Sequence, residues 1–444
     1  MTQTRRLFHT LAALSIALAA GADDPKEDAK LKPTLTEGQT AKNVESFEVV
    51  WKTIRDKHFD PKLGGLDWQA VHDEVKPKVE RASTMQEARE AIGDALERLH
   101  QTHFGIIPGD VARMLDDDVK AAQGVGETGL SVRVIDGKAV VTAAAEGSTG
   151  AKAGVKPGWV VVKVRDKPVD KVLEAAQKAY AKSGMVEAYK AVSVAGRLRG
   201  PVGGTIAVDF LDAADAPVRL DVPLAEPAGV RAKFGNLPPF YVTFVSKRVG
   251  GSVGYVSLNA FFDPVHVMKA FGEAVAANRD ADGLIIDLRG NPGGIGAMAM
   301  GLGGWFVKGG DSKLGTMITR DGSFHFSLNP RAEPFEGPVA LVVDELSMST
   351  SEVLCGGLHD LKLARVFGTK TPGAALPSRV DVLPNGDRFQ YAFANYISVG
   401  GKPLEGAGVV PDVSAPPTRA ALLEGRDPAV DAAVAWIKSQ KSAR

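Results

Sequence analysis

Three short runs of apolar residues in the second half of the chain constrain the fold most. They cover residues 253–258, 283–288 and 339–343. Each run is about as long as one β-strand, and continuous apolar runs of that length are typical of strands buried on both faces. Helical spacing of apolar residues lies between the runs, at 265–277 and 297–307. The pattern therefore predicts an α/β core over about residues 236–416, in which strands and helices alternate.

The run at 339–343 leads into a serine-rich turn, and a helical pattern follows that turn. A serine such as Ser349 in this place is held rigidly beside the unpaired N–H groups of the first helical turn. Acyl-transfer enzymes use that arrangement for a nucleophile and for donors to an oxyanion. Ser349 and Glu352 also fit a Ser-x-x-Glu capping box, which merely starts a helix. Both interpretations remain open from this segment alone.

A glycine-rich loop follows the run at 283–288 and reads Asp287-Leu-Arg-Gly-Asn-Pro-Gly-Gly294. Glycines allow backbone amides to face a ligand, so this loop can supply an oxyanion donor. The alternative is a tight turn from strand to helix. The loop is not a phosphate-binding loop, because it lacks the glycine-lysine-serine ending.

Two isolated residues outside these turns are further candidates. His103 follows a helical pattern and precedes Phe104-Gly105, and a single histidine there can equally be a satisfied structural residue. Glu405 lies in a segment rich in glycine and proline, where it can equally be a solvated surface carboxylate. Neither residue indicates a function by itself.

The remaining segments divide the chain into further units. Residues 43–115 show helical spacing and include a capping box that begins at Thr84. Residues 124–227 alternate short strands with turns, which indicates a mainly β domain with one helix near 169–181. Residues 417–444 form a predicted helical tail, whose last helix begins with the pair Asp427-Pro428.

The first residues predict export. Residues 1–22 combine paired arginines, a short apolar run and small residues for cleavage, as signal peptides do. Residues 23–42 are polar and read as a flexible linker. The expected location is periplasmic or extracellular, without a stable membrane anchor after signal removal. Which export route the chain takes is left open.

Charge and cysteine content limit the partners. The chain has 53 basic and 53 acidic residues and no basic stripe, so nucleic acid is not an expected partner. The single cysteine, Cys355, lies in an apolar stretch and excludes a disulfide within the chain. No metal site or other cofactor is predicted, and a homo-oligomer is left open.

The segment 124–227 resembles a PDZ domain of the bacterial protease type. The resemblance depends on Gly129-Leu-Ser-Val132, on Ala151-Lys-Ala-Gly-Val-Lys-Pro-Gly158 and on Arg165-Asp-Lys-Pro-Val169. PDZ domains add a peptide as a strand to a sheet edge and capture its terminal carboxylate with backbone amides. The resemblance implies that Gly129, Leu130, Ser131 and Val132 form that binding loop. A small β-domain without a ligand is the alternative.

From about residue 44 to residue 413, the chain resembles the C-terminal processing peptidases and tricorn-like serine proteases. The helical segment, the PDZ-like insert, the glycine loop and the serine turn follow in the family's order. The resemblance implies an α/β catalytic core with crotonase/ClpP-like strand–helix repeats, a helical N-terminal segment and an inserted mainly-β PDZ-like domain. It also implies that Ser349 is the nucleophile, with an oxyanion hole formed by Gly293 or Gly294 and by Thr350.

One departure from the family pattern determines the expected mechanism. Members with a serine–lysine dyad carry their base as the second lysine of a Lys-Thr-Phe-Gly-Lys-Gly type of segment. Here Lys370 matches the first lysine, and Ala374 stands in the catalytic place. The tricorn-like branch uses a histidine oriented by a glutamate instead, and its motifs fall on His103 and Glu405.

The resemblance therefore implies an exported serine endopeptidase that cuts polypeptides with the triad Ser349, His103 and Glu405. The PDZ-like domain would hold the substrate, and whether it does so by the C-terminus is left open. Two alternatives remain open. One is a catalytically silent polypeptide- or ligand-binding protein on the same scaffold, and the other is a dyad peptidase that uses Lys370 as its base.

Overall fold

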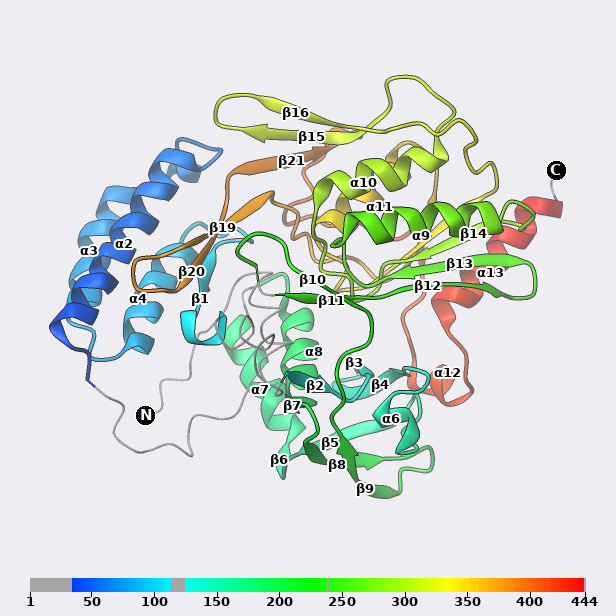
Figure 1. Cartoon of the computed structure of the whole chain (residues 1–444), viewed down its shortest axis with the longest axis horizontal. Coiled ribbons are helices and arrows are strands. Elements are labelled where there is room, and N and C mark those ends of the chain that lie inside the picture. The colour runs from blue at the N-terminus through cyan, green and yellow to red at the C-terminus, as the bar shows by residue number, and fades with distance from the viewer. Residues whose placement is uncertain (1–33, 113–123, 182, 238, 443–444) are drawn as a thin grey trace.

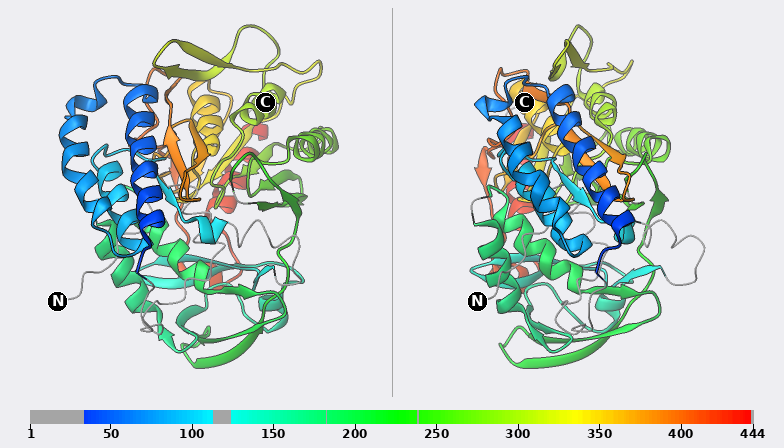
Figure 2. Two further views of the ribbon diagram at one scale, coloured as in Figure 1. Left: turned by 60° about the vertical axis from the view of Figure 1, so that its left-hand side comes forward. Right: turned by 90° about the vertical axis from the view of Figure 1, so that its left-hand side faces the viewer.

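The computed structural model describes residues 34–112, 124–181, 183–237 and 239–442. The predicted signal at 1–22 and most of the predicted linker lie outside these residues. The chain forms a helical N-terminal part, a mixed α/β core and an inserted domain between them, which lies below both in the turned views (Figure 1, Figure 2). Within the described residues, no helix is long and apolar enough to cross a membrane.

The N-terminal part consists of three α-helices and a short 3-10 turn among the described residues. They are α2 (Glu37–Lys57), η1 (Leu63–Gly65), α3 (Trp68–Glu80) and α4 (Met85–Glu97). Thr36 caps α2 in a capping box with Gln39, so the helix begins before the predicted linker ends. The expectation of a linker is therefore wrong for residues 37–42, because local capping orders this polar stretch. The helix α3 was not recognised separately in the sequence.

The core has a central sheet with the strand order β12-β13-β14-β17-β18-β22. Its strands are β12 (Phe244–Val249), β13 (Val253–Leu258), β14 (Leu284–Asp287), β17 (Val339–Val343), β18 (Arg365–Gly368) and β22 (Val413–Ser414). All neighbours from β13 to β22 are parallel, and β12 pairs with β13 in antiparallel fashion. The three apolar runs are strands β13, β14 and β17, as predicted.

Helices cover both faces of this sheet. They are α9 (Pro264–Ala277), α10 (Gly296–Gly303), η2 (Gly304–Phe306), α11 (Thr350–Asp360) and α13 (Pro428–Ser442). The short helix α12 (Arg419–Leu423) packs instead against the inserted domain. One apolar cluster joins the sheet to α9, α10 and α11, and a second joins its other face to α13. This burial on both faces explains why the strands read as continuous apolar runs.

The inserted domain has a sheet with the order β3-β4-β5-β8-β9 and separate helices. Its elements are β2 (Val125–Glu127), β3 (Leu130–Ile135), β4 (Lys138–Ala144), α6 (Thr149–Lys152), β5 (Val160–Val164), β6 (Lys167–Pro168), α7 (Val169–Tyr180), α8 (Val186–Arg197), β7 (Arg199–Pro201), β8 (Thr205–Leu211) and β9 (Pro217–Pro223). The strands β3, β4, β5 and β8 and the helix α7 agree with the sequence prediction, whereas the other strands and α8 were not predicted. The hairpin β10 (Val230–Ala232) and β11 (Phe240–Val242) leads into the core.

Smaller sheets connect the N-terminal part to the core. The strand β1 (Gly105–Ile107) pairs with β20 (Arg388–Ala392), which in turn pairs with β19 (Ser378–Val382). A further sheet holds β15 (Lys313–Thr319), β16 (Ser323–Ser327) and β21 (Ala394–Ser398). The helices α2 to α4 share one apolar cluster with Phe389 and Tyr391 of β20. The helical part therefore has an apolar cluster of its own, which β20 completes and which fixes the helices to the core.

Candidate active site

Ser349 lies in the turn between β17 and α11 and has a strained backbone, with φ of 54° and ψ of −115°. A residue with a side chain rarely adopts this conformation, which costs about 1–3 kcal/mol and persists only where the surroundings enforce it. The Ser349 N–H donates to the carbonyl oxygen of Ala374 at 2.8 Å and to Glu352 Oε2 at 3.1 Å. The Glu352 half of the predicted capping box is therefore formed at the same serine that is the candidate nucleophile.

His103 lies in the short connection between α4 and β1 and is 2% exposed. It also has a positive φ of 64°, so both candidate residues occupy unusual backbone conformations. The pairing of β1 with β20 fixes the chain directly after it. Burial lowers the pKa of His103 to about 3, which keeps the imidazole neutral near pH 7. A neutral imidazole is the form that can accept a proton.

Thr102 stands between His103 and Glu405. The Thr102 hydroxyl lies 2.7 Å from His103 Nδ1 and donates to Glu405 Oε2 at 3.0 Å. Because a hydroxyl has a single hydrogen, this arrangement makes Nδ1–H the donor to Thr102 and leaves Nε2 as the free acceptor. The Thr102 N–H also donates to Glu405 Oε1 at 2.8 Å. Glu405 is therefore connected to the His103 ring through the Thr102 hydroxyl. Thr102 was not identified from the sequence, although it directly precedes His103.

Glu405 is held by backbone amides and by the Thr102 hydroxyl. It accepts from the Ala375 N–H at 3.0 Å in addition to the two groups of Thr102. Burial raises the pKa of Glu405, and these hydrogen bonds oppose the rise. The segment around Ala375 thus links the Glu405 loop to the neighbourhood of Ser349.

One cavity of about 310 Å³ brings most of the predicted residues together. His103, Ser349, Gly293, Gly294 and Thr350 all line it, although they come from three distant segments. Glu405 does not line this cavity and lies behind Thr102. The remaining lining is mostly apolar and includes Ile295, Val353, Phe234, Phe240, Phe262, Phe326 and Phe393.

The glycine loop lies directly against the serine. A Cβ atom on Gly293 would stand 2.7 Å from Ser349 Cβ and 2.8 Å from the Thr350 nitrogen, so glycine is required there. The Gly293 N–H donates to Asn291 Oδ1 at 2.9 Å, within the loop. Thr350 Oγ1 donates to the Gly294 carbonyl oxygen at 2.9 Å. Of the two glycines, Gly294 is therefore the better candidate for an oxyanion donor together with the Thr350 N–H at the start of α11.

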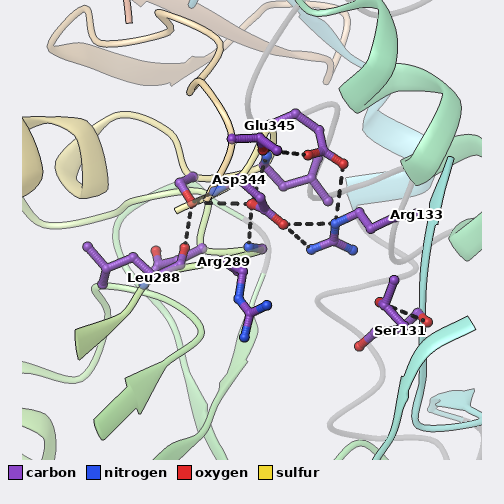
Figure 3. A network of polar contacts seen from close by, with 12 residues as sticks. Ser131, Arg133, Leu288, Arg289, Asp344 and Glu345 are labelled. Atoms are coloured by element: carbon purple, nitrogen blue, oxygen red, sulfur yellow. Dashed lines mark hydrogen bonds and ion pairs between the residues drawn. The ribbon is translucent and has the colours of Figure 1, made fainter. Parts of the chain in front are cut away.

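A buried ion pair connects the inserted domain to the serine turn (Figure 3). Arg133 of β3 donates to Asp344 Oδ2 through Nε at 2.8 Å and through Nη2 at 2.7 Å. Asp344 Oδ1 accepts from the N–H groups of Gly290 at 2.9 Å and Leu346 at 3.0 Å. Glu345 lies 3.4 Å from Arg133 Nε. Asp344 thus holds the glycine loop and the serine turn together, and neither Arg133 nor Asp344 was singled out from the sequence.

The predicted peptide-binding loop of the insert lies apart from this cavity. Gly129 has a φ of 68°, and a Cβ atom there would stand 2.4 Å from Ser148 Cβ. Leu130, Ser131 and Val132 begin β3, which is the end strand of its sheet and packs near α8. None of the four residues lines the catalytic cavity. They are linked to it through Arg133, the next residue of the same strand.

The lysine alternative is not favoured by the geometry. Lys370 is exposed and does not line the cavity. Ala374, in the place of the family's second lysine, is fully buried in a cluster with Met185, Tyr189 and Met348. The helix α8 of the insert supplies Tyr189, so this apolar cluster forms a second contact between the insert and the serine turn.

Comparisons with known proteins agree with these observations. The sequence profile of peptidase family S41 matches residues 252–415, and that of the tricorn protease C1 domain matches residues 40–97. Tricorn protease homolog 2 of Streptomyces coelicolor is 27% identical over 421 residues, which cover 88% of this chain and 32% of the homolog. Carboxyl-terminal-processing peptidase 3, chloroplastic, of Arabidopsis thaliana is 26% identical over 92% of this chain and 77% of its own.

Solved structures share the fold. The photosystem II D1 C-terminal processing protease matches with a TM-score of 0.56 and 21% identity, over 86% of this chain and 93% of its own. Mature CPAF in complex with lactacystin matches with a TM-score of 0.59 and 13% identity, over 87% of this chain and 96% of its own. The profile over the α/β core, the profile over the helical part and these folds lead to one conclusion: residues 252–415 match peptidase family S41, and the chain shares the fold of these processing proteases.

Proposed function

We propose that this protein is an exported serine endopeptidase in which Ser349 attacks the peptide carbonyl and His103 is the general base. The observation that carries the proposal is that these two strained residues, from opposite halves of the chain, line one cavity. A serine hydroxyl is a poor nucleophile near neutral pH, so it requires a base within reach. The neutral imidazole of His103 is in the form that such a base needs.

The proposed reaction is a two-step acyl transfer. His103 Nε2 takes the proton of Ser349 Oγ as that oxygen bonds to the carbonyl carbon, and the carbonyl oxygen becomes an oxyanion. The amides of Gly294 and Thr350 are the proposed donors to this oxyanion. Thr102 and Glu405 hold the ring in the required tautomer and stabilise the imidazolium. His103 returns the proton to the leaving amine, and water then hydrolyses the acyl-enzyme by the same route.

Substrate capture by the inserted domain is part of the proposal. The edge position of β3 is compatible with the addition of a polypeptide strand, and the predicted loop Gly129–Val132 would receive the terminal carboxylate. Arg133 of the same strand contacts Asp344, so a bound peptide would lie close to the ion pair that supports the serine turn. The order of events would then be capture at the insert and cleavage at Ser349.

The experiment that tests the proposed function uses a fluorophosphonate probe and hydrolysis of an unfolded protein. We expect the wild type to be labelled at Ser349 and to hydrolyse the substrate. Ser349→Ala and His103→Ala should each lower hydrolysis by at least about 10³-fold while leaving the fold intact. Wild-type protein that neither reacts with the probe nor cleaves would overturn the proposal and favour a silent binding protein.

The apolar lining of the cavity supports a preference for an apolar side chain next to the scissile bond. Phe234 lines the cavity and is 51% exposed, so it offers a contact surface to a substrate. Phe324 is 50% exposed but does not line the cavity, and it provides a matched control. We expect Phe234→Ser to lower kcat/KM for peptides with a large apolar residue by about 10-fold, and Phe324→Ser to leave it within about 2-fold. Equal effects of the two variants would contradict this preference.

A further inference from the structure

Glu352, in the first turn of α11, is an ionisable residue that is 0% exposed. It accepts four hydrogen bonds, from Thr371 Oγ1 at 2.6 Å and from the N–H groups of Gly373 at 2.8 Å, Ala374 at 2.9 Å and Ser349 at 3.1 Å. A carboxylate has about four acceptor positions, so these donors satisfy it completely. All four partners are electrically neutral, and all four donate. The four donors therefore favour the ionised carboxylate, whereas burial opposes it and raises its pKa.

These bonds exceed what a helix cap requires. A capping box needs only the bond between the glutamate and the N–H of the capping serine. The other three bonds reach residues 371–374, the segment in which the lysine of other members would stand. The Ala374 carbonyl oxygen also accepts the Ser349 N–H, at 2.8 Å. Glu352 and this segment therefore hold the Ser349 amide from two sides.

The same segment continues to the Glu405 loop. Thr371 pairs with Val409, since its N–H donates to the Val409 carbonyl oxygen at 3.1 Å and its Oγ1 accepts the Val409 N–H at 2.7 Å. The Ala375 N–H donates to Glu405 Oε2 at 3.0 Å. A single buried carboxylate thus joins the turn of the nucleophile to the loop that carries the glutamate of the proposed triad. The position of Ser349 relative to Glu405 depends on it.

We propose that Glu352 is a positioning residue that enforces the strained backbone of Ser349 and sets its place relative to the Glu405 loop. The inference depends on the proposed peptidase function, since it concerns the same site. A misplacement of about 1 Å in an active site can cost about 10²-fold in rate. Because Glu352 is fully buried and does not line the cavity, its loss should affect the chemical step more than substrate binding.

The test compares Glu352→Gln with two variants of Thr371, which is one of the hydrogen-bond partners of Glu352. Glu352→Gln keeps the size of the side chain but replaces one carboxylate oxygen by an NH2 group, which would face hydrogen-bond donors. We expect kcat to fall about 10²-fold and KM to stay within about 3-fold of the wild-type value. Thr371→Val removes the donor at 2.6 Å and should lower kcat about 10-fold, whereas Thr371→Ser should recover most of that loss. The rate of fluorophosphonate labelling should fall in parallel with kcat.

The matched control lies two residues earlier in the same segment. Thr369 Oγ1 donates to Glu345 Oε2 at 3.3 Å and not to Glu352, so Thr369→Val should keep kcat within about 2-fold. If Glu352→Gln does not fold, the comparison of Thr371→Val, Thr371→Ser and Thr369→Val still decides. The positioning role would be overturned if Glu352→Gln reacted with the probe as fast as the wild type does. Equal losses of kcat in Thr371→Val and Thr369→Val would also overturn it. Failure of the wild type to react would instead overturn the proposed function.

Discussion

Two buried carboxylates stand on either side of the Ser349 turn, and they are stabilised in different ways. Asp344, before the turn, faces the guanidinium of Arg133 and also accepts from the Gly290 and Leu346 amides. Glu352, after the turn, has only neutral donors among its hydrogen-bond partners. One support thus reaches into the inserted domain, and the other stays within the core.

The difference shows in the proton affinity of the two groups. Burial raises the pKa of Asp344, but Arg133 and the amides outweigh burial and the net pKa is lowered. Burial also raises the pKa of Glu352, and its four hydrogen bonds leave that pKa at about 7. The comparison teaches that a nearby cation, more than the number of hydrogen bonds, keeps a buried carboxylate ionised under mildly acidic conditions.

The largest effect should come from Asp344→Ala. This change leaves Arg133 buried without its main partner and removes the acceptor of two amides, so we expect a loss of about 3–5 kcal/mol in the free energy of unfolding. Urea denaturation measures it. Asp344→Ala together with Arg133→Met should lose much less than Asp344→Ala alone, because no uncompensated charge remains. A loss below about 1 kcal/mol in the single variant would contradict the assignment of this ion pair as a support.

The pH dependence of stability should differ in sign between the two carboxylates. Glu352 binds its proton more tightly in the folded chain than at its ordinary value of 4.5, so its contribution to stability is full below pH 4.5 and is lost as pH rises through about 7. The change in the pKa of Glu352 corresponds to at most about 3 kcal/mol in the free energy of unfolding. Asp344 has a lowered pKa, so its contribution is present above pH 3.8 and is lost as pH falls below that value.

Urea denaturation between pH 3 and pH 8 of the wild type, Glu352→Gln and Asp344→Asn separates these contributions. The difference between wild type and Glu352→Gln should shrink or reverse toward higher pH. The difference between wild type and Asp344→Asn should grow in that direction. If both differences changed in the same direction with pH, the two carboxylates would not have the opposite pKa shifts described above.

A smaller effect is expected from Arg133→Lys. Lysine keeps the charge but cannot donate two parallel hydrogen bonds to Asp344 Oδ2, so the expected loss is about 1–2 kcal/mol in the free energy of unfolding. Thermal or urea denaturation measures this loss, and the free energy of unfolding of Arg133→Met serves as the reference. A lysine variant as unstable as Arg133→Met would mean that geometry, and not charge, dominates this contact.

The smallest effect is expected from Lys370→Ala. Lys370 is exposed and adjacent to Thr371, so it is a cation near the Glu352 segment that points into solvent. Stability should change by less than about 0.5 kcal/mol and kcat by less than about 2-fold. Hydrolysis assays and denaturation measure both quantities. A severe loss of activity would revive the serine–lysine alternative and would place a cation in the neighbourhood of Glu352.

The periodic parts of the molecule could be predicted from the sequence because their signals are local. The strands β13, β14 and β17 are apolar throughout since helices cover both faces of the sheet, and α13 begins at its Asp-Pro cap. The helices α3 and α8 were missed, because their apolar residues pack against neighbours that the sequence does not reveal. The polar residues 37–42 were assigned to a linker, although a capping box orders them.

Only those residues of the candidate site that lie in recognisable sequence motifs could be predicted. Ser349, His103 and Glu405 were selected by resemblance, and their roles remain part of the proposed function. Thr102 was missed because its position between His103 and Glu405 arises from a contact across distant segments. Arg133 and Asp344 were missed for the same reason, and Glu352 was recognised only as part of a capping box. A buried charge reads in a sequence like any surface charge until its partners are known.

The pairing of β1 with β20 has a consequence for the making of the protein. Residues 105–107, directly after His103, are synthesised well before their partner strand at 388–392. On the proposed assignment, base, nucleophile and glutamate cannot meet until residue 405 has left the ribosome. A truncated or nascent chain is then inert as a protease, and the cell that produces it is spared from cleavage by unfinished copies.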